Sequence, residues 1–205
     1  MEKLSEKDIE SNNRVYDLMA SKGDPDFWYD NHKEENYERL LRIEFHSKRS
    51  LKGKSCLDVG CGTGDFSEVL RRKEAAVYVG IDVYLPSLEL AAQKYPDEKF
   101  IKMDILNDDP GQFDFVFCSG ALSTRMDSDN YRFIEAMIRS MWQSARIGVA
   151  FNFLVGDEYD ADIFYYSFNL IEAVCKRIMG DEGILHSLRN EEDEAHMYMC
   201  RVNKE

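Results

Sequence analysis

The sequence predicts an α/β protein whose mostly parallel sheet is covered by helices on both faces. From Ser55 onward, apolar strand-like runs alternate with amphipathic helix-like segments, the pattern of a sheet built from β–α–β units. The first of these runs leads into a glycine-rich loop and then a helix. With 205 residues, 44% of them apolar, the chain is long enough for one domain with a full core.

The alternating part of the chain contains five predicted strands followed by a terminal hairpin. The hairpin, at 184–188 and 195–202, would make one strand run against the parallel ones because its connection is a short acidic turn. Helices are expected where apolar residues recur at helical spacing. The predicted strands are 55–59, 77–81, 99–103, 113–118 and 147–153. The predicted helices run through Phe66 to Leu70 and over 86–94, 131–142 and 163–179.

The first fifty residues look helical and more polar. Gly23-Asp24-Pro25-Asp26 interrupts this segment, and a second helix is predicted over 34–48. We therefore expect residues 1–50 to form an N-terminal helical cap and residues 51–205 to form the α/β domain.

Composition narrows the class of partner. The chain has 26 basic and 39 acidic residues, a formal net charge of −13, and no compensating basic tract. This balance argues against a nucleic-acid substrate, because phosphate contacts depend on lysine and arginine. The charged N-terminus does not resemble a signal peptide, and no apolar run approaches ~20 residues. We expect a cytoplasmic protein with no membrane contact and no metal; its oligomeric state is left open.

The glycine-rich loop reads Leu57-Asp58-Val59-Gly60-Cys61-Gly62-Thr63-Gly64-Asp65-Phe66. Glycines there permit positive φ and close approach of a ligand to the backbone. A dinucleotide site would need glycine at the first, third and sixth positions, and the sixth is Asp65. Its carboxylate would compete with a pyrophosphate for the helix N-terminus. Asp58 and Asp65 would instead suit S-adenosylmethionine, which has no phosphate and carries cationic sulfonium and ammonium groups.

Two further acids follow predicted strands. Asp82 ends the second strand, where a carboxylate can accept hydrogen bonds from ribose hydroxyls. Asp104 follows the third strand and could accept from an adenine amine. Taken singly, each acid is as well explained by a helix cap or a solvated loop. Their spacing from the glycine loop favours the ligand-binding interpretation.

These segments resemble the successive motifs of the class I S-adenosylmethionine-dependent methyltransferases, including small bacterial and archaeal members. LDVGCGTGDF matches the first motif, GIDV the second, KMDI the third and FDFVFCSGAL the fourth. The resemblance implies a Rossmann-like, seven-stranded sheet of order 3-2-1-4-5-7-6 with strand 7 antiparallel. It implies that the three loop glycines cradle the amino-acid end of the cofactor and that an arginine ahead of the loop holds its carboxylate. The implied cofactor-binding residues are Asp58, Gly60, Cys61, Gly62, Gly64, Asp82, Val83, Asp104, Ile105, Ser119 and Arg42.

The acceptor is narrowed mainly by what the sequence lacks. Ser119-Gly120-Ala121-Leu122 follows the fourth strand in place of the Asn-Pro-Pro-Tyr type of motif that holds a planar amine, and no Pro-Cys pair is present for cytosine C5 methylation. We expect methyl transfer to an oxygen or nitrogen of a small molecule. The alternatives are a peptide or protein side chain, a non-catalytic module that binds S-adenosylmethionine, and, less favoured because of Asp65, a dinucleotide oxidoreductase.

Catalytic residues are not evident from the sequence. Methyl transfer depends chiefly on alignment of donor and acceptor, and a base is needed only for an acceptor that holds its proton tightly. The weak candidates for such a base are His46, His32 and Tyr29, with Tyr37 as a further one; His46 is better explained as a partly buried helix residue.

Three other features have two interpretations each. The acidic run 155–162 could hold magnesium but is more simply a solvated loop. The tyrosines near it could line an acceptor pocket or pack in a helix. The hairpin histidines are expected at the surface or in cross-strand pairs. The tyrosines are Tyr159, Tyr165 and Tyr166, and the hairpin histidines are His186 and His196.

Overall fold

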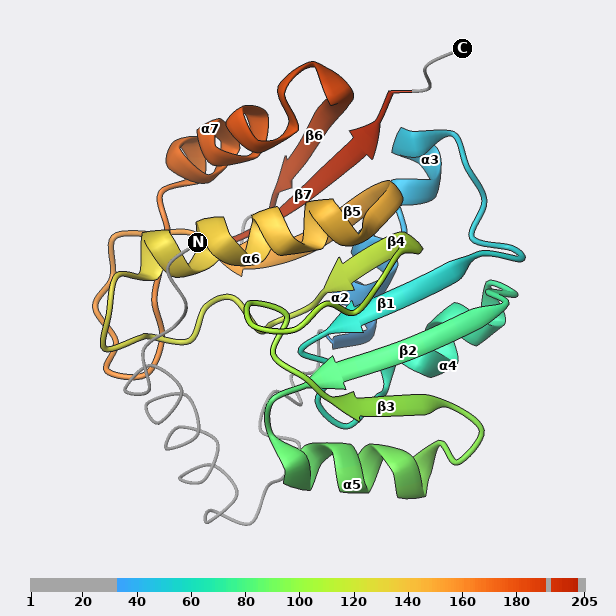
Figure 1. The fold of residues 1–205 in the computed structure, drawn as a ribbon. Coiled ribbons are helices and arrows are strands. Elements are labelled where there is room, and N and C mark those ends of the chain that lie inside the picture. Colours follow the sequence, from blue (N-terminus) through green and yellow to red (C-terminus); the bar gives the residue numbers. More distant parts are fainter. Residues whose placement is uncertain (1–32, 191–192, 203–205) are drawn as a thin grey trace.

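The computed structural model describes residues 33–190 and 193–202. Its centre is one seven-stranded sheet of order β3-β2-β1-β4-β5-β7-β6, with β7 antiparallel to its neighbours (Figure 1). The expected fold class, strand order and antiparallel strand are therefore confirmed. The strands are β1 Ser55–Val59, β2 Val77–Asp82, β3 Lys99–Lys102, β4 Phe113–Cys118, β5 Ala145–Leu154, β6 Gly183–Arg189 and β7 Glu194–Arg201.

The register of the strands brings the important loops to one edge. β1 pairs in parallel with β2 and β4, and β4 pairs in parallel with β5, so the carboxyl ends of these four strands lie together. Because β7 is antiparallel, its first residue joins that edge: Glu194 lies opposite Leu154 at the end of β5. Ligands of open α/β sheets bind at this edge.

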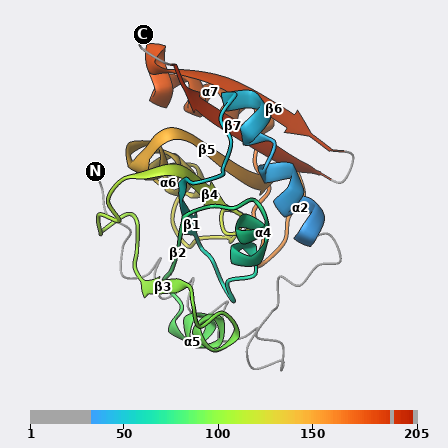
Figure 2. The ribbon, with the colours of Figure 1, turned by 90° about the vertical axis from the view of Figure 1, so that its right-hand side faces the viewer.

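Helices cover both faces of the sheet. On one face, α6 (Asn130–Ser144) packs on β4 and β5, and α7 (Phe168–Met179) on β6 and β7. On the other face lie α2 (Lys33–Leu40), α3 (Ile43–Ser47) and α4 (Phe66–Arg72), as Figure 2 shows from the side. Helix α5 (Leu85–Lys94) runs along β3. The alternation of strand side chains sends Leu57 and Val59 into one core cluster and Cys56 into the other.

The helix predicted over 34–48 is wrong in detail, because it is broken into α2 and α3. Tyr37, Leu40 and Ile43 are buried in the same core cluster as residues of the central strands. The break lets both short helices follow the twisted sheet face with their apolar sides inward. The described part of the segment 1–50 is thus integral to the domain core. The cap predicted for residues 1–32 lies outside the described residues.

The helix predicted over 163–179 begins only at Phe168. The residues before it are extended and pair with other loops, through the bridges Thr124–Ile163, Tyr159–Phe164 and Val155–Tyr166. Tyr166 is fully buried, and its hydroxyl donates to the Leu122 carbonyl at 2.8 Å. Tertiary pairing therefore overrides the helical spacing of this segment. None of the helices within the described ranges is long and apolar enough to cross a membrane.

Candidate functional site

The glycine loop turns β1 into α4 through three left-handed glycines. Gly60, Gly62 and Gly64 have φ values of 70°, 51° and 79°, which confirms the expected need for glycine. The backbone amides of Gly60 and Cys61 donate to the Ile81 carbonyl at 2.8 and 3.1 Å. The loop is therefore held across the end of β2.

The three glycines have different surroundings. A Cβ on Gly60 would overlap the Ala121 side chain, and one on Gly64 would lie 2.6 Å from the Phe100 ring. A Cβ on Gly62 would meet nothing within 4 Å in the described part of the chain. Gly60 and Gly64 thus serve close packing, whereas Gly62 faces open space at the middle of the loop. The cradle for the amino-acid end of a cofactor is predicted at this loop.

Asp58 lies beneath the loop, on the α4 side of β1. It is 2% exposed, and the Tyr78 hydroxyl donates to its Oδ2 at 2.8 Å. Burial raises the pKa of Asp58 to about 7; the Tyr78 hydrogen bond opposes this rise, and the nearby charge of Asp82 adds to it. A cationic ligand above the loop would favour the ionised carboxylate.

Asp82 connects the end of β2 to the glycine loop. Its Oδ2 accepts from the Gly62 amide and its Oδ1 from the Tyr84 amide, both at 2.9 Å. Burial raises the pKa of Asp82, against the lowering effect of these backbone donors. Asp82 thus lies directly at the glycine loop, and its predicted contact with a ribose stays a prediction. Two buried carboxylates, Asp58 and Asp82, make this place suited to a positively charged ligand.

The surroundings of Asp65 correct the expectation that its carboxylate would disfavour a pyrophosphate. Its carboxylate accepts from Lys33 Nζ at 2.5 Å and from Lys94, Tyr95 and Thr63. Burial would raise its pKa, but the hydrogen bonds from Lys33 and Lys94 outweigh that effect and lower the pKa well below its usual range. Asp65 is ionised but neutralised by two lysines, so its charge does not by itself repel a phosphate. The argument against a dinucleotide therefore depends on Asp58, because an acid at the position of Asp82 also belongs to the dinucleotide fingerprint.

The residues after β2, β3 and β4 have mixed roles. Asp104 Oδ1 accepts from the Leu106 amide at 2.9 Å, so this acid caps its own turn. Ile105 is 5% exposed and belongs to the core, while Val83 and Ser119 are half-buried at the strand ends. The buried Cys61 side chain packs against Gly80. Adenine and ribose contacts by these residues stay predictions.

Arg42 and His46 lie on the segment that packs against β7. Arg42 is exposed between α2 and α3, and its charge lowers the pKa of His46 and of His196. The His46 ring stacks on His186 at 4.4 Å and lies 4.6 Å from the Tyr198 ring, over the middle of β7. His46 is therefore not proposed as a base, and the contact of Arg42 with the cofactor carboxylate stays a prediction.

The other predicted residues divide between the core and the surface. Tyr37 stacks on Phe66 at 4.6 Å and is a core residue. His196 is fully buried, so a surface position for it is wrong. Tyr159 is 84% exposed, while Tyr166 packs in the core. Tyr29 and His32 lie outside the described residues. Within the described ranges no three His, Cys, Asp or Glu side chains gather as a metal site would require.

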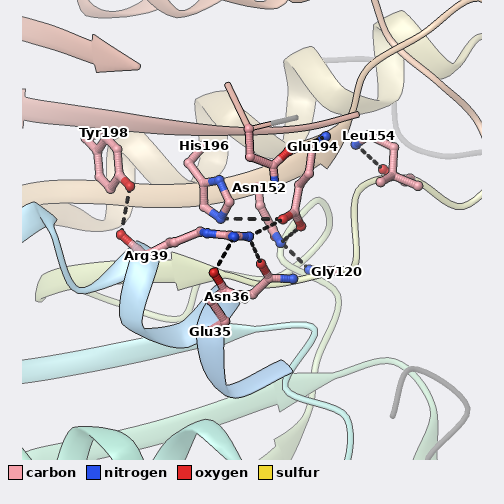
Figure 3. Close-up of polar contacts among 11 residues, drawn as sticks. Glu35, Asn36, Arg39, Gly120, Asn152, Leu154, Glu194, His196 and Tyr198 are labelled. Carbon is pink, nitrogen blue, oxygen red and sulfur yellow. Dashed lines mark hydrogen bonds and ion pairs between the residues drawn. The ribbon is translucent and has the colours of Figure 1, made fainter. Parts of the chain in front are cut away.

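The sequence analysis missed two polar residues at the carboxyl edge, Asn152 and Glu194. Asn152 is 3% exposed on β5, and its side chain connects the Gly120 amide to the Glu194 carboxylate (Figure 3). The available signal was one amide within the apolar run Ala150-Phe151-Asn152-Phe153-Leu154. A buried polar side chain in such a run needs partners, and only the fold shows which ones.

Solved structures resemble this fold along nearly its whole length. Magnesium protoporphyrin IX methyltransferase from Synechocystis PCC 6803, with bound S-adenosylhomocysteine, superposes with a TM-score of 0.71 and 15% identity over 93% of this chain and 99% of that one. The N-methyltransferase NodS from Bradyrhizobium japonicum WM9, also with bound S-adenosylhomocysteine, gives 0.69 and 16% identity over 94% and 100%. At these identities the likeness concerns the fold. The chain therefore has the Rossmann-like fold of class I methyltransferases.

Sequence comparison agrees with this class. Residues 56–144 match the family described as "Methyltransferase domain". Ubiquinone biosynthesis O-methyltransferase from Xylella fastidiosa (strain M23) is 36% identical over 103 residues, which cover 44% of this chain and 41% of that protein. The namesake from Neisseria meningitidis serogroup C is 38% identical over 88 residues, 39% and 36% of the two chains. The matches thus span about two-fifths of these relatives. The family match likewise covers less than half of this chain, and it shows that this part is similar to methyltransferase domains.

Proposed function

We propose that this protein binds S-adenosylmethionine and transfers its methyl group to an oxygen or nitrogen of a small-molecule acceptor. The observation that carries the proposal is the pair of buried carboxylates, Asp58 and Asp82, beside a left-handed Gly62 that faces open space. A site with two buried acids favours a cation, and S-adenosylmethionine is a sulfonium with an additional ammonium group. A pyrophosphate above the loop would meet the Asp58 carboxylate unfavourably.

The chain's own residues would hold the cofactor and exclude water. The backbone around Gly62 would receive the amino-acid end, and Asp82 would accept from the ribose hydroxyls with lone pairs left over from Gly62 and Tyr84. S-adenosylmethionine supplies a methyl group on positively charged sulfur, already activated for displacement. The chain's contribution is then mainly alignment, which can supply ~7–11 kcal/mol of the barrier. The loop at Ser119 and Gly120 is the proposed meeting place with the acceptor.

The choice of acceptor atom has support from the similar proteins only. The curated relatives are named O-methyltransferases of ubiquinone biosynthesis, and one structural neighbour is titled an N-methyltransferase. Both names describe transfer to a heteroatom. The short stretch after β4 lacks the Asn-Pro-Pro-Tyr type of motif, which agrees with an acceptor other than a nucleobase amine.

Calorimetric titration with S-adenosylmethionine, S-adenosylhomocysteine and NAD tests the cofactor. We expect micromolar binding of the first two and no heat from NAD. Gly62→Ala should weaken binding at least tenfold because its Cβ enters the open space of the loop. Gly111→Ala is the matched control: Gly111 also has positive φ, 84°, and open surroundings, but lies in the loop before β4. It should cost similar stability and leave the affinity unchanged.

Two results would contradict the proposal. If folded wild-type protein binds NAD and neither adenosyl compound, the cofactor assignment is wrong. If Gly62→Ala and Gly111→Ala change the affinity equally, the ligand does not lie over Gly62. An acceptor screen then follows S-adenosylhomocysteine formation with panels of phenols, carboxylates, amines and peptides. Turnover of peptides alone would replace the small-molecule assignment with peptide methylation.

A further inference from the structure

Asn152 occupies a buried position at which its amide has a single usable orientation. Its Oδ1 accepts from the Gly120 amide at 2.8 Å, and its Nδ2 donates to Glu194 Oε1 at 2.6 Å (Figure 3). An ionised carboxylate can only accept, so Glu194 forces the Asn152 NH₂ group toward itself. The Asn152 carbonyl is thereby aimed at Gly120.

Glu194 extends this connection from β7 to helix α2. Its side chain is 12% exposed, and its Oε2 lies 3.5 Å from Arg39 Nη1. The Arg39 guanidinium also contacts Glu35 at 2.5 Å, and the Arg39 carbonyl accepts from Tyr198 at 2.7 Å (Figure 3). His196 Nε2 is 3.8 Å from the same Glu194 oxygen, but burial lowers the pKa of His196 to about 3. That histidine is neutral at pH 7, whereas Arg39 is a cation that faces Glu194 from the described part of the chain.

Gly120, whose amide donates to Asn152, is the last residue of this series of contacts. It is left-handed, with φ of 74°, and a Cβ there would meet none of the described residues within 4 Å. Gly62 on the neighbouring loop faces open space in the same way. The backbone of Gly120 therefore borders open space at the carboxyl edge, directly after β4. A small rotation of its peptide would change the wall that a bound molecule contacts.

We propose that Asn152 and Glu194 are positioning residues, which set the Gly120 peptide at the acceptor side of the site and connect it to Arg39 on α2. The effect on ligand binding rests on the proposed function; the control of the Gly120 peptide does not. These contacts link the Arg39 guanidinium on α2, by way of Glu194 and Asn152, to the loop after β4. A change in α2 would then alter the loop without direct contact between them.

Swapping the amide of Asn152 and the carboxylate of Glu194 tests whether the two side chains act together on Gly120. Asn152→Asp places a second carboxylate against Glu194 and removes the donor between them. Glu194→Gln is milder, because its amide can present oxygen to Asn152. In the double variant Asn152→Asp/Glu194→Gln, the introduced amide can donate its NH₂ to the introduced carboxylate, and that carboxylate can still accept from Gly120. The pattern of donors and acceptors is thereby restored with the negative charge moved across the contact.

Hydrogen exchange of individual amides, measured by NMR, is the first readout and needs no cofactor. We expect exchange at Gly120 to accelerate about tenfold or more relative to Val149 in Asn152→Asp, and to return to within about threefold in the double variant. Val149 is the reference because it lies in the buried middle of β5. If Asn152→Asp does not fold, Asn152→Ser serves the same comparison without an added charge. If Asn152 only supports overall stability, its replacement would accelerate amide exchange at Gly120 and Val149 equally. That result would overturn the proposal.

Affinity for S-adenosylhomocysteine is the second readout. We expect Asn152→Asp to weaken it several-fold and the double variant to regain most of the loss. If the double variant stays as impaired as Asn152→Asp in both readouts, the side chains do not act as one connection and the proposal is wrong. If wild-type protein fails to bind S-adenosylhomocysteine while the Gly120 exchange follows the expected pattern, the proposed function fails and the connection stands.

Discussion

Asp58 couples the glycine loop to pH, because burial brings its pKa to about 7 in the protein without ligand. Binding of a cationic cofactor favours the ionised form, so below pH 7 binding must release a proton. We expect the affinity for S-adenosylmethionine to rise between about pH 5.5 and 7, by up to tenfold per pH unit, and to level off near about pH 7.5. Calorimetry across this range measures the effect. The rise in affinity occurs below the pH at which the amino group of S-adenosylmethionine itself titrates.

Two variants separate Asp58 from other titrating groups. Asp58→Asn should bind weakly and with little pH dependence over the same range. Tyr78→Phe removes a hydrogen bond that lowers the pKa of Asp58, so the rise in affinity should move to higher pH. A wild-type affinity that does not vary across this range would contradict the role of Asp58.

His196 contributes a pH dependence of stability with a defined sign. Its pKa falls from 6.5 to about 3 on folding, chiefly through burial. Between these values the unfolded chain binds a proton that the folded protein does not, so stability is lost as the pH falls from 6.5 toward 3. We expect about 1 kcal/mol per pH unit from this residue. Asp58 acts in the opposite direction between 3.8 and about 7, because its pKa is raised on folding.

The measurement therefore compares wild type with His196→Leu in urea unfolding at several pH values. Both His196 ring nitrogens lack hydrogen-bond partners among the described residues, so an apolar replacement forfeits no such bond there. The free energy of unfolding of the variant relative to wild type should increase as the pH falls from about 6.5 to about 4.5. A difference that stays constant over that range would show that His196 binds protons equally in the folded and unfolded chain, against the expectation.

At the scale of elements, Arg125 connects the loop after β4 to the loop after β5 through hydrogen bonds. Its Nε donates to the Asp160 carbonyl at 2.5 Å and its Nη2 to the Ile163 carbonyl at 3.0 Å. The guanidinium also lies 4.7 Å from the Tyr159 ring and 5.1 Å from the Phe164 ring. These contacts order the extended segment that replaces the predicted helix start.

Arg125→Ala should loosen this segment selectively. We expect amide exchange across 157–166 to accelerate about tenfold because two charge-assisted hydrogen bonds are lost, while the β5 amides change little. Arg146→Ala, at an exposed position near the start of β5, is the control and should leave both regions unchanged. Equal acceleration in the loop and in β5 would show that Arg125 supports global stability and not the loop pairing.

At the scale of the whole molecule, helices α2 to α4 share one core cluster with the sheet. We therefore expect a single cooperative unfolding transition that ligand shifts as a unit. S-adenosylhomocysteine at about 100 times its Kd should add ~2.7 kcal/mol to the free energy of unfolding, or about 5–10 °C in Tm for a chain of this size. Scanning calorimetry measures this, with NAD at the same concentration as control. An equal shift by NAD would contradict the cofactor assignment.

Sequence patterns determined the sheet and the location of the site. Apolar runs bounded by turn residues placed the ends of every strand to within two residues, because a buried parallel strand must be largely apolar. The three glycines were recognisable because left-handed backbone excludes most other side chains. The strand order came from resemblance, since local patterns contain no information about which strands become neighbours.

Only the tertiary structure decided which charges face a ligand. Asp58 and Asp65 have equal standing in the sequence, but Lys33 and Lys94 neutralise Asp65 from α2 and α5, whereas the Asp58 carboxylate accepts from the neutral Tyr78 hydroxyl. The Asn152–Glu194 contact joins residues 42 apart and depends on the antiparallel register of β7. Burial, counter-charge and hydrogen-bond partners are properties of packing between distant segments. For that reason the sequence identified the candidate site, and only the fold showed which of its charges are buried and which are paired.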